Sequence, residues 1–261
     1  MCGIAGYSID PSSELRRTLA AQALLAGIAE RGADAVGYAF RDATGEVSVH
    51  KQRSGASDLL ERIEVPQSAT EVLVHVRDYT KGNPTIAANN HPIRHGAVVG
   101  IHNGVIFNDE EILTGHGFEH AEPEMTVDSE AIFALVQEAG GQAAALEELR
   151  GSMAAAWLDE RRPEFLFCAR GVGRPLWLGE GRDAAFFAST KGTLEIVERY
   201  ASLKLHKREV PEGMLIALRD GKLVGKEHFS PNRSFEETPL PSVRAPHEGA
   251  FCLKRLATLA A

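Results

Sequence analysis

The chain of 261 residues contains only three cysteines, Cys2, Cys168 and Cys252, which lie far apart. An odd number of widely spaced cysteines argues against a disulfide framework and indicates a reducing compartment. No apolar run approaches the eighteen or so residues that a transmembrane helix needs. Met1-Cys2-Gly3-Ile4 also lacks the basic leader of a signal peptide. We therefore expect a cytoplasmic protein that does not associate with a membrane.

Positive charge is equally scarce. The chain has 28 Lys and Arg residues against 36 Asp and Glu, a net charge of -8, and no basic block. This balance argues against nucleic acid as a partner. His91 and His95 are four residues apart, as are His116 and His120, but Pro92 or Gly117 interrupts each pair. Because neither pair lies on a regular helical face, we expect no metal site, and no motif indicates another cofactor.

The hydrophobic pattern predicts a layered α+β domain. Strands are expected at 3–9, 35–41, 46–51, 71–77, 97–102, 152–158, 164–169, 175–178, 184–188, 213–219 and 222–228. Helices are expected at about 15–31, 57–63, 109–114, 129–138, 142–150 and 191–199, with a short one inside 250–261. Residues 230–246 contain several prolines and polar residues, which is typical of a surface tail.

The position of Cys2 at the start of the chain gives it a possible catalytic role. Removal of Met1 would leave one residue carrying both a thiol and a free α-amine. A thiol becomes a strong nucleophile only when a base takes its proton, and an N-terminal amine can be that base. The reference pKa values, about 8 for the amine and about 8.5 for the thiol, suit this transfer. The simpler interpretation is that Cys2 is a small buried residue at the start of a strand.

Further groups of polar residues and glycines are unusual for an ordinary hydrophobic core. They are the stretch Arg31-Gly32-Ala33-Asp34, the stretch His75-Val76-Arg77, the loop carrying Thr80, Gly82, Asn90, His91 and Pro92, the stretch His102-Asn103-Gly104, and Asp128. In this order and at this spacing, together with Cys2, they resemble the class II glutamine amidotransferase domain. The likeness covers residues 2–228 and is strongest to the glucosamine-6-phosphate synthase type, because of the Arg31-Gly32 and Asn90-His91-Pro92 stretches.

The resemblance implies a fold and a reaction. The fold would be an N-terminal nucleophile hydrolase, a four-layer αββα sandwich of two antiparallel sheets. The reaction would hydrolyse the side-chain amide of L-glutamine through a γ-glutamyl thioester on Cys2. Asn103 and Gly104 would stabilise the oxyanion, Arg77 and Asp128 would bind the amino-acid head group, and Thr80 and Gly82 would belong to a loop over the substrate. Arg31 would hold the first residue in place.

Each implied role has a physical basis and a structural alternative. An oxyanion needs preorganised donors, which Asn103 and Gly104 can supply from a tight turn, although Asn-Gly also occurs in ordinary hairpins. A carboxylate suits the forked guanidinium of Arg77, which could otherwise be a surface residue at a strand end. Asp128 can pair with an α-ammonium or simply cap the following helix. For Arg31 the alternative is a cation at a helix C-terminus.

Two residues depart from the synthase-type pattern. Asp78 stands where that type has an aromatic residue, and Lys81 stands where it has a histidine. Loop closure and ammonia gating therefore need not follow that type.

The chain leaves no room for a synthase domain after residue 228, so 229–261 is expected to be a C-terminal tail. We expect a stand-alone glutaminase that supplies ammonia to a separate synthase subunit. Hydrolysis of another γ-glutamyl amide, or glutamine binding without catalysis, are the alternatives.

Overall fold

The structure, a computed structural model, describes residues 2–42, 44–238 and 241–260. One sheet has seven strands in the order β11 (His206–Glu209), β9 (Trp177–Glu180), β10 (Ala184–Ala188), β1 (Gly3–Ile9), β4 (Glu71–Arg77), β2 (Ala35–Arg41) and β3 (Val47–Gln52). The other has six, in the order β13 (Lys222–His228), β12 (Met214–Arg219), β8 (Leu166–Arg170), β7 (Gly151–Asp159), β6 (Val98–Ile106) and β5 (Ile93–His95). All neighbouring strands in both sheets are antiparallel.

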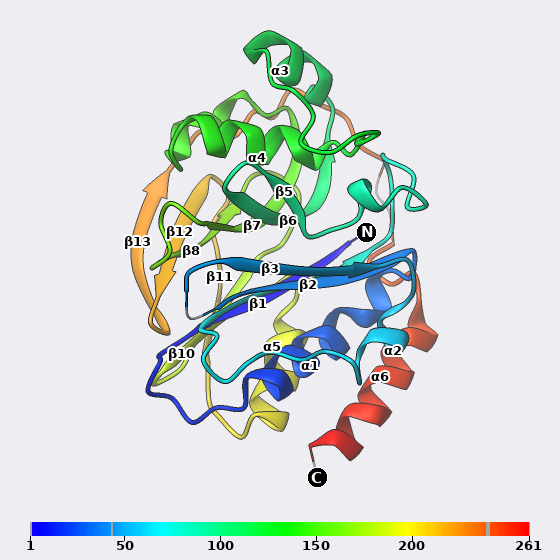
Figure 1. Cartoon of the computed structure of the whole chain (residues 1–261), viewed down its shortest axis with the longest axis vertical. Helices are drawn as coiled ribbons and strands as arrows, with labels where there is room; N and C mark the ends of the chain where they lie inside the picture. The colour runs from blue at the N-terminus through cyan, green and yellow to red at the C-terminus, as the bar shows by residue number, and fades with distance from the viewer. Residues whose placement is uncertain (1, 43, 239–240, 261) are drawn as a thin grey trace.

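Helices cover the outer face of each sheet, which gives four layers (Figure 1). On the side of the six-stranded sheet lie α3 (Asp109–His116), α4 (Ser129–Glu138) and the 3₁₀ helix η3 (Ala143–Glu148). On the side of the seven-stranded sheet lie α1 (Arg17–Ile28), the 3₁₀ helix η1 (Ala29–Arg31), α2 (Ala56–Leu59), α5 (Lys191–Tyr200) and α6 (Pro246–Leu259). A further 3₁₀ turn, η2 (Ala87–Asn89), lies in the loop after β4. The expected αββα sandwich of two antiparallel sheets is confirmed.

Three hydrophobic cores fill the spaces between these four layers. One joins α1, α5 and α6 to the seven-stranded sheet, and a second joins α3 and α4 to the six-stranded sheet. The third lies between the sheets and includes Ile4, Leu73 and Ile101. Because strand side chains alternate in direction, these three residues also fix which neighbours face the space between the sheets. Cys2, His75, Arg77 and Asn103 share that inner face.

Helix α1 is buried around most of its circumference, because α6 packs against it in addition to the sheet and α5 (Figure 1). A helix that is apolar on all sides requires such enclosure. Cys252 and Leu256 of α6 have no solvent-exposed surface. The expected boundary after residue 228 stays a prediction, but residues 246–259 contribute side chains to the core and form a longer helix than the short one expected.

Most expected elements are present, with local differences. The segment 142–150 forms the 3₁₀ helix η3, and α2 is only four residues long. The short strands β5 and β11 were not expected, since three or four residues carry too little periodicity to be detected. A tight turn joins β12 and β13 into a hairpin, in which Asp220 and Gly221 both have positive φ, at 48° and 71°.

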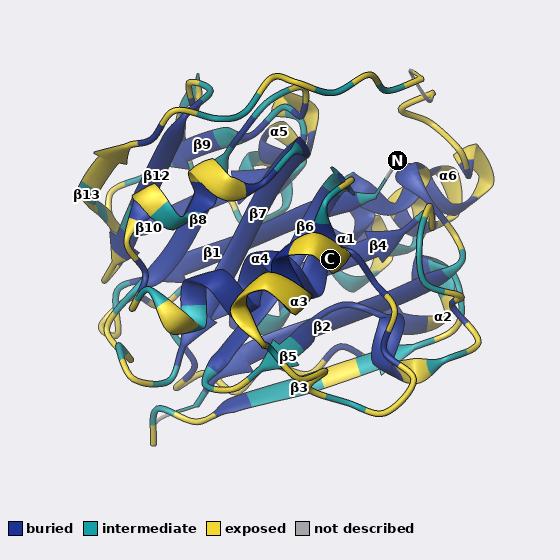
Figure 2. Ribbon diagram, turned by 90° about the horizontal axis from the view of Figure 1, so that it is seen from above, coloured by how far each residue is buried: buried dark blue, intermediate teal, exposed yellow. Residues whose placement is uncertain are grey.

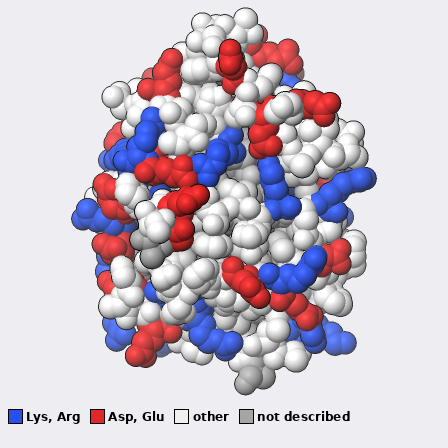
Figure 3. All heavy atoms as spheres, viewed as in Figure 1, with Lys and Arg blue, Asp and Glu red and all other residues white. Residues whose placement is uncertain are grey.

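Acidic and basic side chains are interspersed on the face seen in Figure 3, without an extended basic surface there. Among the described residues, no helix is long and apolar enough to cross a membrane.

Candidate active site

Cys2 lies at the edge where β1 begins, beside the end of β4. Gly3 pairs with Val76 and Ile4 with His75, so the antiparallel register brings Cys2 opposite Arg77. The Cys2 Sγ lies 3.5 Å from the carbonyl oxygen of Asp78. Arg31 Nε donates to the carbonyl oxygen of Cys2 at 2.8 Å. The residue is thus held from two sides, and the contact predicted between Arg31 and the first residue is present.

The resting thiol of Cys2 is protonated near neutral pH. Burial raises its pKa, and the positive charge of Arg77 acts in the opposite direction without reversing the shift. A thiol whose pKa lies above that of free cysteine is a poor nucleophile by itself. Any reaction at Cys2 therefore needs a base to remove its proton.

Arg77 is 1% exposed and organises the loop that follows its strand. Its Nη1 donates to Asn90 Oδ1 at 2.6 Å, and its Nη2 donates to the carbonyl oxygens of Lys81, at 2.8 Å, and Gly82. Burial lowers the pKa of the guanidinium, while nearby Cys2 and Asp128 raise it. An arginine side chain has five N–H donors, so these three bonds leave capacity for a ligand.

Asn103 is completely buried, yet neither Oδ1 nor Nδ2 has a hydrogen-bond partner among the described residues. Buried amides are nearly always paired, because an unpaired polar group costs about 1–3 kcal/mol. Asn103 faces the space between the sheets, as Cys2 does from β1. An amide donor that folding leaves unused is available to a ligand at this position.

The Asn-Gly turn expected at 103–104 is wrong. Asn103 and Gly104 lie inside β6, whose pairing with β7 continues from Val98–Asp159 to Ile106–Gly151. Gly104 has φ of 150°, and a Cβ placed there would lie 1.9 Å from the carbonyl oxygen of Ser152. The glycine is required by this close approach of two strands rather than by a turn, which local sequence cannot reveal.

Two buried histidines lie next to these residues, and the first of them connects the two sheets. His75 Nε2 donates to the carbonyl oxygen of His102 at 3.1 Å, joining β4 to β6. His102 Nε2 donates to Ser152 O at 3.3 Å, so its Nδ1 accepts from Ser129 Oγ at 2.8 Å. Burial lowers the pKa of both rings to about 3, which keeps them neutral. The bridge ties the strand of Arg77 to the strand of Asn103.

Asp128 precedes α4 but does not cap it. Its side chain makes no capping bond, and its Oδ2 accepts from the backbone N–H of Ile106 at 2.7 Å. The carboxyl group is 3% exposed, and burial raises its pKa to about 7. The capping alternative is therefore wrong. The acid is fixed beside the end of β6, two residues beyond Gly104.

Only part of the loop after Arg77 contacts the candidate site. Gly82 has φ of 77° and contacts Arg77 through its carbonyl oxygen, whereas Thr80 is exposed. No hydrogen bond within the described residues joins Thr80 to the other predicted site residues. Lys81 forms ion pairs with Asp109, at 2.6 Å, and with Glu110, at 3.1 Å. The residue that departs from the family pattern thus ties the loop to α3.

Sequence reasoning assigned no role to Asn90, His75 or His102, although all three lie within the motifs that it identified. Their contacts bind Arg77 and connect the sheets. Their polar character in apolar or glycine-containing stretches was the available signal.

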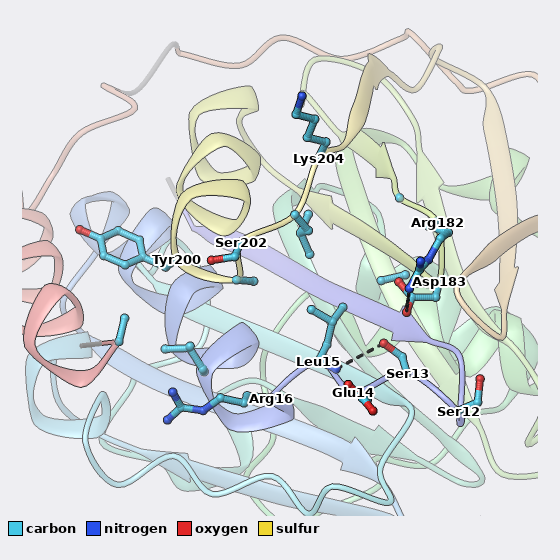
Figure 4. A pocket seen from close by; sticks show the side chains of 16 residues that line it. Ser12, Ser13, Glu14, Leu15, Arg16, Arg182, Asp183, Tyr200, Ser202 and Lys204 are labelled. Carbon is cyan, nitrogen blue, oxygen red and sulfur yellow. Dashed lines mark hydrogen bonds and ion pairs between the residues drawn. The ribbon is translucent and has the colours of Figure 1, made fainter.

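A cleft of about 1060 Å³ opens at the opposite end of β1, near Ile9 (Figure 4). Ser13, Arg16, Asp183, Tyr200 and Lys204 are among its lining residues, and none of the predicted site residues lines it. The candidate active site is therefore defined by its chemistry and not by the size of a cleft. The part of the chain that the structure describes contains no group of three or more His, Cys, Asp or Glu arranged to hold a metal ion.

Comparison with known proteins finds similarity to glutamine amidotransferases. Residues 67–195 match the family described as "Glutamine amidotransferase domain". The glutamine–fructose-6-phosphate aminotransferase (isomerizing) of Escherichia coli O6:H1 is 31% identical over 221 residues, covering 78% of this chain and 34% of that protein. The enzyme of the same name from Shouchella clausii is 26% identical over 233 residues, covering 84% of this chain and 36% of that protein. The chain thus spans about a third of the length of these curated relatives.

A solved structure shows the same fold. The glutamine phosphoribosylpyrophosphate amidotransferase of B. subtilis superimposes with a TM-score of 0.70 at 20% sequence identity, over 88% of this chain and 50% of that one. The two-sheet sandwich, the motif order and the family match lead to one assignment. The chain contains a class II glutamine amidotransferase domain with the N-terminal nucleophile hydrolase fold.

Proposed function

We propose that this chain hydrolyses the side-chain amide of L-glutamine, with Cys2 as the nucleophile. After removal of Met1, the α-amine of Cys2 takes the thiol proton as Sγ attacks the amide carbon. The tetrahedral intermediate collapses, the C–N bond breaks, and the proton passes from the α-amine to the departing ammonia. Water then attacks the γ-glutamyl thioester, which releases glutamate and restores the thiol.

The unpaired amide of Asn103 is the observation that carries this proposal. The developing oxyanion needs donors that are already in place and shielded from water, and the loss of one such donor commonly costs about 3–4 kcal/mol. Asn103 Nδ2 is buried and unpaired in the described part of the chain. The backbone N–H of Gly104 would be the second donor. A purely structural role would not explain why a buried amide has no partner.

Arg77 and Asp128 would recognise the amino-acid head group of the substrate. The guanidinium retains donors for the α-carboxylate, and the carboxyl group of Asp128 would pair with the α-ammonium. Both groups are buried, and their charges interact. Bringing an ammonium close to Asp128 would lower the pKa of its carboxyl group and restore the negative charge.

We also propose that the ammonia is passed to an acceptor that is not among the residues described here, on a synthase domain or subunit. Support comes from the relatives, whose names combine glutamine with a second substrate and of whose chains this one matches only about a third. The amidotransferase unit itself would be 2–228, as expected from the sequence.

Alkylation by 6-diazo-5-oxo-L-norleucine, a glutamine analogue, tests the proposal. Intact-mass measurement should show loss of Met1 and one adduct that peptide mapping places on Cys2, together with glutaminase activity. Cys2→Ala should abolish both the adduct and the activity. Cys252→Ala is the matched control, because burial raises the pKa of this thiol to about 12 and it lies on α6. Full glutaminase activity in Cys2→Ala would refute the mechanism.

A further inference from the structure

The segment that connects β13 to α6 passes along the edge of the candidate active site. Its described residues, 229–238 and 241–245, are called the strap below. It contains no helix or strand of its own. In Figure 2 it follows one edge of the molecule from β13 to α6. A segment that follows this path could simply link β13 to α6. Its contacts show whether it also contributes to the candidate active site.

The end of the strap nearest α6 contacts the segments that hold Cys2. Arg244 Nε donates to Asp78 Oδ1 at 3.3 Å, and Asp78 is the residue whose carbonyl oxygen contacts the Cys2 thiol. The backbone N–H groups of Arg244 and Ala245 both donate to the carbonyl oxygen of Glu30, at 2.9 Å. Glu30 immediately precedes Arg31, which binds the backbone of Cys2. This contact therefore joins the strap to both sides of the nucleophile.

The other end of the strap contacts the end of β6. The ring of Phe235 lies 5.8 Å from the ring of Phe107, and Asn232 pairs with Arg150. Phe107 donates its N–H to the carbonyl oxygen of Arg150 at 2.9 Å. It also follows Ile106, whose N–H binds Asp128. This contact places the strap against the residue that follows Ile106, the backbone partner of Asp128.

Between these contacts, Glu237 forms an ion pair with Arg174 of the loop after β8. The two side chains are only 13% and 10% exposed. The charge of Arg174 contributes to lowering the pKa of both Arg31 and His102, which places it near the candidate site. Removing Glu237 would leave a nearly buried guanidinium without its counter-ion, so this contact resists displacement of the strap.

From these three contacts we propose that Phe235, Glu237 and Arg244 hold the strap as an outer wall of the active site, and that this wall limits the size of the amide it admits. The inference rests on the proposed glutaminase function and deepens it: the substrate class is free glutamine, and γ-glutamyl amides with bulky nitrogen substituents are excluded. The strap contacts Asp78, whose carbonyl oxygen meets the Cys2 thiol, and Glu30, which precedes Arg31. It also contacts Phe107, which follows the residue that binds Asp128. A linker to α6 would not require these contacts.

The test compares the parent with Phe235→Ala, Glu237→Gln, Arg244→Ala and the triple variant. Glu236→Gln is the matched control for Glu237, because this neighbouring side chain is exposed. Phe251→Ala, on the outer face of α6 at 51% exposure, is the control for Phe235. The first measurement is the rate of Cys2 alkylation by small iodoacetamide and by large fluorescein maleimide, assigned by peptide mapping. The second is kcat/KM for glutamine and for γ-glutamyl-4-nitroanilide.

In the triple variant, the rate ratio of large to small reagent should rise by about five-fold or more, the effect of losing roughly 1 kcal/mol of contacts. The preference for the anilide over glutamine should rise in parallel, and both controls should match the parent. Unchanged ratios in the triple variant would overturn the proposal. An equal increase with both reagents would also overturn it, because that result means general loosening. If the parent hydrolyses neither substrate while the alkylation ratio still shifts, the wall stands and the proposed function fails.

Discussion

Replacement of Asp128 by Asn should separate stability from substrate binding. The buried carboxyl group has its pKa raised to about 7, so it resists ionisation in the folded chain. At pH values between the ordinary pKa of Asp and this raised pKa, the folded chain binds more protons at Asp128 than the unfolded chain does. Stability from this group is therefore present at low pH and is lost as the pH rises toward 7.

The size of this effect follows from the shift. Taking the ordinary value of 3.8 and the raised value of about 7, ionisation of Asp128 costs the folded chain about 2–3 kcal/mol between pH 5 and pH 8. Asn keeps an oxygen that can accept from the Ile106 N–H but does not titrate. The unfolding free energy of Asp128→Asn, relative to the parent, should therefore increase by about 2–3 kcal/mol over this range.

The same variant should bind glutamine poorly. A hydrogen bond to a charged group contributes about 1.5–3 kcal/mol, which corresponds to an increase in KM of roughly 10- to 150-fold. In the parent, kcat/KM should rise as the pH increases through 7, and the variant should lose the part of this rise that Asp128 causes. Urea unfolding at pH 5 and pH 8 and initial-rate kinetics provide the measurements. A relative stability that does not change with pH would refute the burial argument, and an unchanged KM would remove Asp128 from the site.

Three further substitutions test other parts of the argument. Asn103→Ala should lower kcat by about 10²–10³-fold with little change in thermal stability, because the amide has no hydrogen bond to lose; a normal kcat would exclude it as an oxyanion donor. Gly104→Ala should lower the Tm, since its Cβ would meet a backbone oxygen of β7 at 1.9 Å, whereas Gly115→Ala in α3, with open space around it, should not; equal Tm values would contradict this geometry. Leu256→Ala should reduce the unfolding free energy by about 2–5 kcal/mol and Phe251→Ala by less than about 0.5 kcal/mol, measured by urea denaturation; similar losses would mean that α6 does not pack as described.

Sequence reasoning located most strands because their apolar residues alternate or run continuously. β1, β4 and β10 begin and end where expected. It failed where the determining contact is distant in sequence. Asn103-Gly104 has the local signature of a turn, but pairing with β7, about fifty residues later, keeps it extended. The same reason explains Asp128, whose position before a helix indicates a cap while its partner is Ile106.

By itself, the sequence determined the alternation that builds two sheets, the α+β class, and the set of polar residues whose order resembles an amidotransferase. These properties are local, because a few neighbouring residues specify each strand, turn or motif. Only the tertiary structure decided that Asn103 is buried without a partner, that Arg77 binds Asn90 and the loop carbonyls, and that the strap reaches Arg174 and Asp78. Those outcomes depend on the packing of two sheets against each other, which brings together groups that the chain keeps far apart.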